Sequence, residues 1–146
     1  MLPHDPLRVH SARLCRHPTL HQFVKFGIVG GIGFIVDAGV LYACMKGLGM
    51  GPYSGRIVSF ISAASSTWFC NRHFTFKDSK GEDKLHVQWI KFLVVSMGGF
   101  TFNYGAYAAL IWGSPLVAAY PILGVAAGSI AGMFFNFFVS RKLVFR

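Results

Sequence analysis

Charged side chains are scarce in this 146-residue chain. They make up 13% of its residues and only five are acidic, whereas 53% of the residues are hydrophobic. A soluble domain carries about twice that charged fraction. The apolar residues are also clustered, and the stretches 92–112 and 116–139 contain no Lys, Arg, Asp, Glu or His. This shortage of charge argues against a soluble globular domain and favours a membrane protein.

Four apolar stretches are candidates for crossing a bilayer. A hydrocarbon core of about 30 Å needs about 20 helical residues. Three stretches reach that length, and the fourth, 53–70, is shorter and contains Arg56 near its start. The stretches do not alternate polar and apolar residues, and open sheets are excluded in lipid. The sequence therefore predicts an all-α membrane protein with four transmembrane helices.

The sequence also lacks the residue patterns of catalytic and cofactor sites. Asp37 is the one carboxylate inside an apolar stretch, so paired acid–base catalysis has no second partner. The three cysteines lack metal-ligand spacing, and the glycine-rich segment 30–33 is embedded in an apolar stretch rather than in a nucleotide-binding loop. We expect no enzymatic activity, no catalytic residue, no metal and no cofactor. Nucleic acid is not an expected partner despite the net charge of +9, because the cations gather beside the membrane.

The chain contains an internal duplication. At a shift of 66 positions, Lys25, Phe26, Val29, Gly33, Phe34, Gly39 and Ala43 recur as Lys91, Phe92, Val95, Gly99, Phe100, Gly105 and Ala109. At a shift of 69, the segment 72–77 recurs as 141–146 with the pattern Arg-x-x-x-Phe-(Lys/Arg). Each half holds two apolar stretches, so the halves should lie parallel, related by an axis along the membrane normal. We expect a tail at 1–22 and a four-helix domain at 23–146, with repeats at 23–77 and 89–146.

Basic residues are unevenly distributed between the two ends of the predicted helices. Lys46 and Arg56 flank the first short turn, and the other twelve of the fourteen Lys and Arg residues lie at the opposite ends. The positive-inside rule then places both termini and the middle loop in the cytoplasm. This imbalance counts against an antiparallel dimer of dual topology. We expect a multi-pass protein of the cell's inner, cytoplasmic membrane.

Two charged residues lie within the predicted spans, Asp37 and Arg56. Counting about 1.5 Å per residue places both roughly 20 Å from the inner interface. Because an unpaired charge at that depth is costly, an ion pair is expected. Asn103 and Val125 occupy the matched positions in the second half, so both charges are absent there together. The alternative is that Arg56 extends to the outer headgroups while Asp37 is protonated or faces water.

A stripe of small residues follows the second helix of each half. The two stripes are Gly55, Ser59, Ala63 and Thr67, and Gly124, Gly128, Gly132 and Asn136. Such stripes let helix backbones approach closely. They can pack within one bundle, face each other across the pseudo-twofold axis, or form a seam between subunits.

Four cations stand at the inner ends of the predicted helices. They are Lys25, Arg72, Lys91 and Arg141, with Asn71 beside them. Arg offers a planar fork and Lys a point charge, so the set suits a phosphate. The alternative is that these cations are ordinary topology signals that bind anionic lipids without specificity.

The combined pattern resembles the GtrA-like family of small four-helix membrane proteins. The motifs that carry the resemblance are Phe23-Val-Lys25-Phe26, the intramembrane Asp37, Asn71-Arg72-x-Phe74-x-Phe76, and the copies at 89–92 and 141–145. The second copy has Ser140 in place of the asparagine and Leu143 in place of the first aromatic residue.

The resemblance implies translocation of a polyprenyl-phosphate-linked sugar across the cytoplasmic membrane, for cell-surface polysaccharide synthesis or glycosylation. The phosphate would bind Lys25, Arg72, Lys91, Arg141 and Asn71, and the sugar would pass a polar path of Asp37, Arg56, Asn103, Asn136 and Thr67. A membrane glycosyltransferase is an implied partner, and so small a chain is expected to form a homo-oligomer. The alternatives are a non-transporting anchor that recruits a glycosyltransferase and a small ion-coupled exporter that uses Asp37.

Overall fold

The computed structural model describes residues 18–146, and helices account for most of them. In chain order the elements are α2 (Pro18–Tyr42), η1 (Ala43–Gly47), α3 (Pro52–Cys70), η2 (Asn71–Thr75), α4 (Leu85–Gly113), α5 (Pro115–Ala119), α6 (Pro121–Val139) and η3 (Ser140–Val144). The three η elements are single π-helical turns that continue the helices before them. Most of the expected tail lies outside the described residues, and α2 already begins at Pro18.

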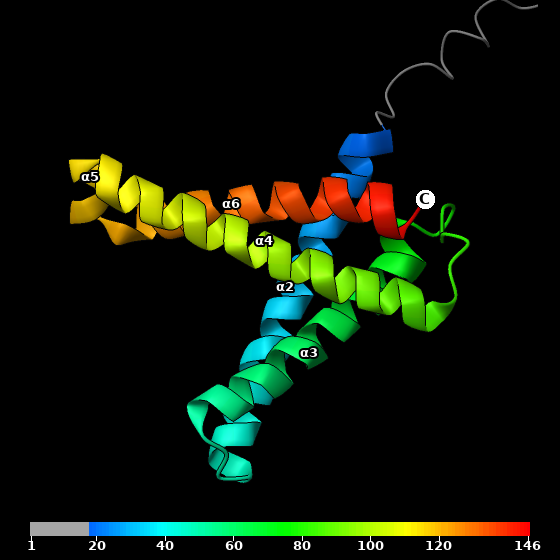
Figure 1. Ribbon diagram of the computed structural model, residues 1–146, viewed down its shortest axis with the longest axis horizontal. Helices are drawn as coiled ribbons and strands as arrows, with labels where there is room; N and C mark the ends of the chain where they lie inside the picture. Colours follow the sequence, from blue (N-terminus) through cyan, green and yellow to red (C-terminus); the bar gives the residue numbers. More distant parts are fainter. Residues whose placement is uncertain (1–17) are drawn as a thin grey trace, which may run out of the picture.

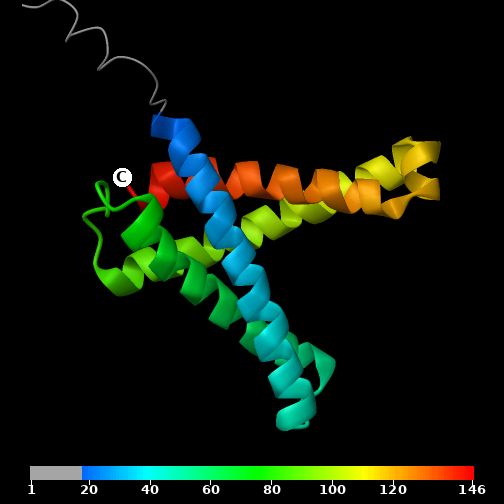
Figure 2. The same cartoon turned by 180° about the vertical axis from the view of Figure 1, so that it is seen from behind.

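Two helical hairpins make up the fold. One pairs α2 with α3, and the other pairs α4 with α6. The hairpins meet at one end, which carries the C-terminus and the loop 76–84, and then splay apart so that their turns lie far from each other (Figures 1 and 2). We call the meeting region the shared end and the two turns the free ends.

Glycine and proline set the turns at the free ends. In the first hairpin Gly49 adopts φ 65° and Pro52 opens α3. In the second hairpin the stretch expected to be one helix over 116–139 is divided into α5 and α6. Tyr120 lies at φ −127° and ψ 76° because a residue before proline avoids the helical region, so the expectation of a single helix there is wrong.

An aromatic core joins the hairpins at the shared end. The side chains of Phe76 and Phe145 are fully buried and stack with ring centroids 4.6 Å apart. Phe26 meets Phe76 at 6.3 Å with an interplanar angle of 65°, and Phe92 meets Phe145 at 6.0 Å with the same angle. Positions matched by the duplication therefore make matching contacts.

The small-residue stripes pack inside their own hairpins. A Cβ added at Gly128 would lie 2.5 Å from the backbone oxygen of Asn103, and one at Gly132 would lie 2.8 Å from that of Gly99. Gly55 likewise faces α2 in the first hairpin. These glycines thus bring the two helices of one hairpin together. Ala63 and Thr67 of the first stripe and Gly132 and Asn136 of the second also line the space between the hairpins.

The surface of both hairpins is apolar. Large hydrophobic side chains remain exposed along them, including Phe34, Ile35, Phe100 and Trp112. The segments Pro18–Gly47 and Leu123–Val144 are long and apolar enough to cross a membrane by length and composition. The 29 residues of α4 span about 44 Å, which exceeds a hydrocarbon core of about 30 Å. A helix of that length fits a bilayer when it is tilted, as a splayed pair of hairpins requires.

Candidate functional site

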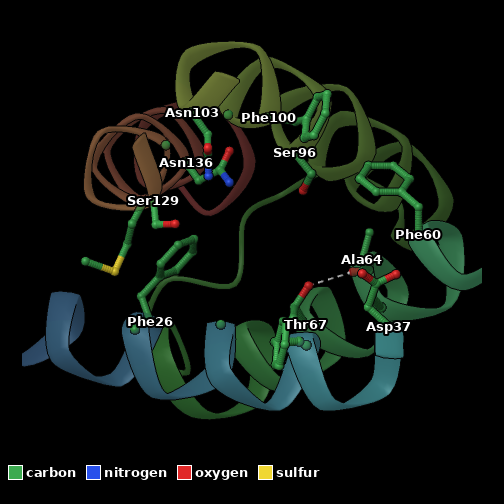
Figure 3. A pocket seen from close by; sticks show the side chains of 18 residues that line it. Phe26, Asp37, Phe60, Ala64, Thr67, Ser96, Phe100, Asn103, Ser129 and Asn136 are labelled. Atoms are coloured by element: carbon green, nitrogen blue, oxygen red, sulfur yellow. Dashed lines mark hydrogen bonds between the residues drawn. The ribbon is translucent and has the colours of Figure 1, made fainter. Parts of the chain in front are cut away.

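A polar cleft of about 510 Å³ lies between the two hairpins. All four long helices contribute to it, and Figure 3 shows the labelled side chains around its opening. Its polar lining consists of Asp37, Thr67, Ser96, Asn103, Ser129 and Asn136. The glycines Gly27, Gly30 and Gly33 present the backbone side of α2 to the cleft, which leaves the space open. Four of the five residues expected on a polar path are therefore brought together.

Two acceptor oxygens of residues that line this cleft have no hydrogen-bond partner. Within residues 18–146, Asp37 Oδ1 and Asn136 Oδ1 are buried and have no hydrogen-bond partner. Thr67 uses its hydroxyl locally, because Oγ1 donates to the carbonyl of Ala64 at 3.0 Å. A buried acceptor without a partner is costly.

The predicted ion pair between Asp37 and Arg56 is confirmed. Arg56 Nη1 donates to Asp37 Oδ2, which joins α3 to α2. The Asp37 side chain is 19% exposed and lines the cleft, whereas that of Arg56 is 51% exposed. Arg56 is the one expected path residue that does not line the cleft, and it borders a second cavity instead.

The four helix-end cations all lie at the shared end, where each has a partner of its own. Lys25 Nζ lies 3.5 Å from the carbonyl oxygen of Phe74 and 5.0 Å from the centroid of its ring. Lys91 pairs with Asp83 at 2.6 Å. Arg141 Nη1 donates to Thr19 Oγ1 at 2.6 Å and so links η3 to the start of α2.

The fourth cation, Arg72, belongs to a buried network around Gln88. Its Nη1 donates to Gln88 Oε1 at 2.5 Å and to the carbonyl of Lys80 at 2.7 Å. Gln88 is fully buried, and its Nε2 donates to the carbonyls of Val144, at 3.0 Å, and Lys80. The network ties the loop, α4 and η3 together. Sequence reasoning missed Gln88, although the 66-residue shift matches it with Gln22 and could have revealed it.

Asn71, expected beside the phosphate, is buried inside its π-helical turn. The side chain is 1% exposed, and its Oδ1 accepts a hydrogen bond from Thr75 Oγ1 at 2.7 Å. The turn also closes through its backbone, because Phe76 N donates to the carbonyl of Asn71 at 2.8 Å. In this arrangement Asn71 supports the turn that carries Arg72.

Two serines of the cleft were also missed. Ser96 lies seven residues before Asn103 on α4, and Ser129 lies seven residues before Asn136 on α6. A spacing of seven puts two residues on one helix face. That periodicity was visible in the sequence and could have placed both serines beside the path.

Comparison with known families now adds to this geometry. A family model described as "GtrA/DPMS, transmembrane domain" matches residues 25–146. The chain belongs to this family. It is also similar to a "Bactoprenol-linked glucose translocase" of Shigella flexneri, at 26% identity over 118 residues, which cover 80% of this chain and 91% of the relative. The resemblance inferred from the sequence motifs is confirmed, and the chain is a multi-pass membrane protein whose regular elements over residues 18–146 are all helices.

Proposed function

We propose that this protein translocates a polyprenyl-phosphate-linked sugar across the cytoplasmic membrane, as a transporter and not as an enzyme. The observation that carries the proposal is the polar cleft between two hairpins whose outer surfaces are apolar. The similarity of the chain to a bactoprenol-linked glucose translocase supports the same substrate class. The product would serve cell-surface polysaccharide synthesis or glycosylation.

The size and lining of the cleft suit the sugar. Its volume of about 510 Å³ falls within the range of about 300–1,000 Å³ that is typical of small-molecule sites. Serine and threonine hydroxyls and asparagine amides both donate and accept hydrogen bonds, as sugar hydroxyls require. The sugar would therefore cross the apolar region with polar partners, while the polyprenyl chain stays in lipid or against the protein's apolar surface.

The cations of the shared end would receive the phosphate. Lys25, Lys91 and Arg141 lie at this end and keep donors beyond their present bonds, and Arg72 is held by its network on Gln88. Anionic lipids would bind the same surface. This arrangement requires the shared end to face the cytoplasm, with both termini inside. The excess of Lys and Arg there supports that orientation.

A parallel relation between the repeats 23–77 and 89–146 belongs to the same proposal, as does a four-helix domain over 23–146. The matched contacts Phe26–Phe76 and Phe92–Phe145 support it, since equivalent helix ends meet at one level. The hairpins meet at the shared end and splay apart beyond it, and the polar cleft lies between them. A second copy of the chain would close it, and we include a homo-oligomer in the proposal.

Reconstitution into liposomes tests the function. Polyprenyl-phosphate glucose, the sugar class named for the relative, would be placed in the inner leaflet and its arrival outside measured with a membrane-impermeant oxidant. Ser96→Leu and Ser129→Leu fill the cleft and should slow translocation about tenfold or more, because a leucine removes both space and a polar partner. Ser62→Leu on α3 borders neither cavity and is the matched control. Transport that is absent in the native protein, or unchanged in both cleft variants, contradicts the proposal.

The same experiment separates the alternatives. An anchor that recruits a glycosyltransferase would retain that enzyme in a pull-down while the liposomes show no translocation. An ion-coupled exporter would lose activity with Asp37→Asn in a proton-gradient assay without any lipid-linked sugar. The pairing of Asp37 with Arg56 favours a structural role for this carboxylate over a proton-carrying one.

A further inference from the structure

A second cavity, of about 650 Å³, lies on the other side of α3 and α4 from the polar cleft. We call it the apolar groove, and its lining includes Arg56, Phe60 and Ile61 of α3 and Leu93, Met97, Phe100 and Thr101 of α4. The Thr101 hydroxyl donates to the carbonyl of Met97 at 3.1 Å, so its polarity is satisfied within α4. Arg56 is the charged residue of a groove that is otherwise apolar.

The groove and the cleft share a wall. Phe60 of α3 and Phe100 of α4 line both cavities, and Figure 3 shows them together at the side of the cleft where these helices approach. The ion pair has one member in each cavity, since Asp37 lines the cleft and Arg56 lines the groove. Two aromatic residues and one ion pair therefore lie between a compartment that contains six polar side chains and one that is apolar apart from Arg56 and Thr101.

This order of compartments corresponds to the order of groups in one kind of ligand. A lipid-linked sugar has a hydroxyl-rich head, an anionic phosphate and a long apolar chain. The cleft offers serine hydroxyls and asparagine amides to the head, and the groove offers apolar walls to the chain. Arg56 stands where the two compartments meet. Its bond to Asp37 uses one of the five guanidinium donors, and its side chain is half exposed, so it can bind a phosphate oxygen without releasing Asp37.

We propose that the apolar groove between α3 and α4 holds the polyprenyl chain next to its phosphate, with the phosphate on Arg56 and the sugar across the Phe60–Phe100 wall in the cleft. This inference rests on the proposed function and adds to it a second phosphate position, distant from the cations of the shared end. The ligand would leave those cations and reach Arg56 towards the free ends. Phe60 and Phe100 would be positioning residues that keep the sugar in the cleft and the polyprenyl chain in the groove.

Chain binding can be tested without any sugar. The probe is a polyprenyl phosphate that carries a photoreactive group in its first isoprene unit, added to the native protein in nanodiscs. Met97→Trp and, on the other helix, Ile61→Trp fill the groove from exposed positions. Val94→Trp is the matched control, because Val94 is equally exposed on α4 and borders neither cavity. Crosslinking should fall about fivefold or more in both groove variants, since a filled groove has no room for the chain, and should persist in the control.

A second arm tests the phosphate. The double variant Asp37→Asn, Arg56→Gln removes the cation without leaving a carboxylate unpaired. Crosslinking of the polyprenyl phosphate should fall to the level given by the corresponding polyprenol, which has no phosphate. An excess of phosphatidylglycerol should compete poorly in the native protein, because the groove would be specific for the polyprenyl chain.

The outcomes distinguish this inference from the function on which it rests. Equal crosslinking in Met97→Trp and Val94→Trp, in a protein that translocates the sugar, overturns the groove and leaves the function standing. Selective crosslinking in a protein that translocates nothing supports the groove and overturns the transport proposal. Full competition by phosphatidylglycerol also overturns the inference, since the groove would then be a site for ordinary membrane lipid.

Discussion

The two hairpins share a set of contacts at the shared end and differ inside the membrane. Phe76 and Phe145 occupy matched positions and stack on each other, each with a matched phenylalanine at its edge. Farther along, the first hairpin is joined by the Asp37–Arg56 ion pair. The second hairpin has Asn103 and Val125 at those positions.

The second hairpin joins its helices by close backbone packing instead. Gly128 and Gly132 leave no space for a Cβ against α4, whereas the first hairpin accommodates Ser59 and Ala63 at the matched positions. The two halves thus contribute matching phenylalanines to the core that joins the hairpins. Within each hairpin the helices are held together differently, by an ion pair in the first and by glycine packing in the second. Both hairpins border both cavities, but their contributions differ. The first hairpin supplies the charged residues Asp37 and Arg56, and the second supplies four of the six polar side chains of the cleft, Ser96, Asn103, Ser129 and Asn136.

The largest loss of stability is expected from substitutions that remove the aromatic contacts joining the two hairpins. Phe76→Ala and Phe145→Ala should each lower the free energy of unfolding by about 3–5 kcal/mol, because each removes a fully buried ring. The double variant should cost less than the sum, since the rings contact each other. Unfolding by denaturing detergent in mixed micelles measures all three. If either variant has the same free energy of unfolding as the native protein, the two hairpins do not contribute equally to the stability of this core.

The ion pair is the next largest difference between the hairpins. Arg56→Val leaves Asp37 without its partner and should destabilise the protein by about 3 kcal/mol. The double variant Asp37→Asn, Arg56→Val gives the first hairpin the residues of the second and should recover to within about 1 kcal/mol of the native protein. The same unfolding assay measures both. A double variant that is as unstable as Arg56→Val alone would contradict the pairing.

Close packing in the second hairpin should be sensitive to one methyl group. Gly132→Ala places a Cβ 2.8 Å from the backbone oxygen of Gly99 and should cost about 1–3 kcal/mol. The reverse change at the matched position, Ala63→Gly, should cost only about 0.5–1 kcal/mol through helix propensity. Thermal denaturation in detergent, followed by size-exclusion chromatography, compares the two. Equal losses would mean that the two hairpins pack at the same distance.

The smallest effects are expected at two matched side-chain contacts between the hairpins, one made by α4 with α3 and the other by α2 with α6. Trp89 Nε1 donates to Ser65 Oγ at 2.9 Å, and at the matched positions Phe23 packs on Phe134 with centroids 4.8 Å apart. Ser65→Ala should cost about 0.5–1.5 kcal/mol through the lost hydrogen bond. Phe134→Leu should cost a similar amount through the lost ring contact. Tryptophan fluorescence reports the first change, and a shift at Trp89 without any loss of stability would show that the bond is dispensable.

Much of the candidate site could be predicted because the chain duplicates itself. The joint absence of Asp37 and Arg56 equivalents in the second half indicated the ion pair, and the structure contains it. The division into α5 and α6 before Pro121 was not predicted, because the stretch 116–139 was defined by its lack of charged residues and the proline within it was not considered. The recurrence of Gln22 as Gln88 marks this residue in the sequence. Its burial and its partners could not be predicted, because Arg72, Lys80 and Val144 come from three separate segments.

The sequence by itself determined the helical class, the turns with glycine and proline, and the pairing of charges, since these follow from local composition and from residue spacing along a helix. The tertiary structure alone decided that the hairpins splay from a shared aromatic end, that the glycines of the small-residue stripes pack inside their own hairpins, and that one cleft and one groove meet at Phe60 and Phe100. Those features depend on which helix faces approach each other across long separations in the chain. Periodicity marks such a face, but it does not identify the face against which it packs.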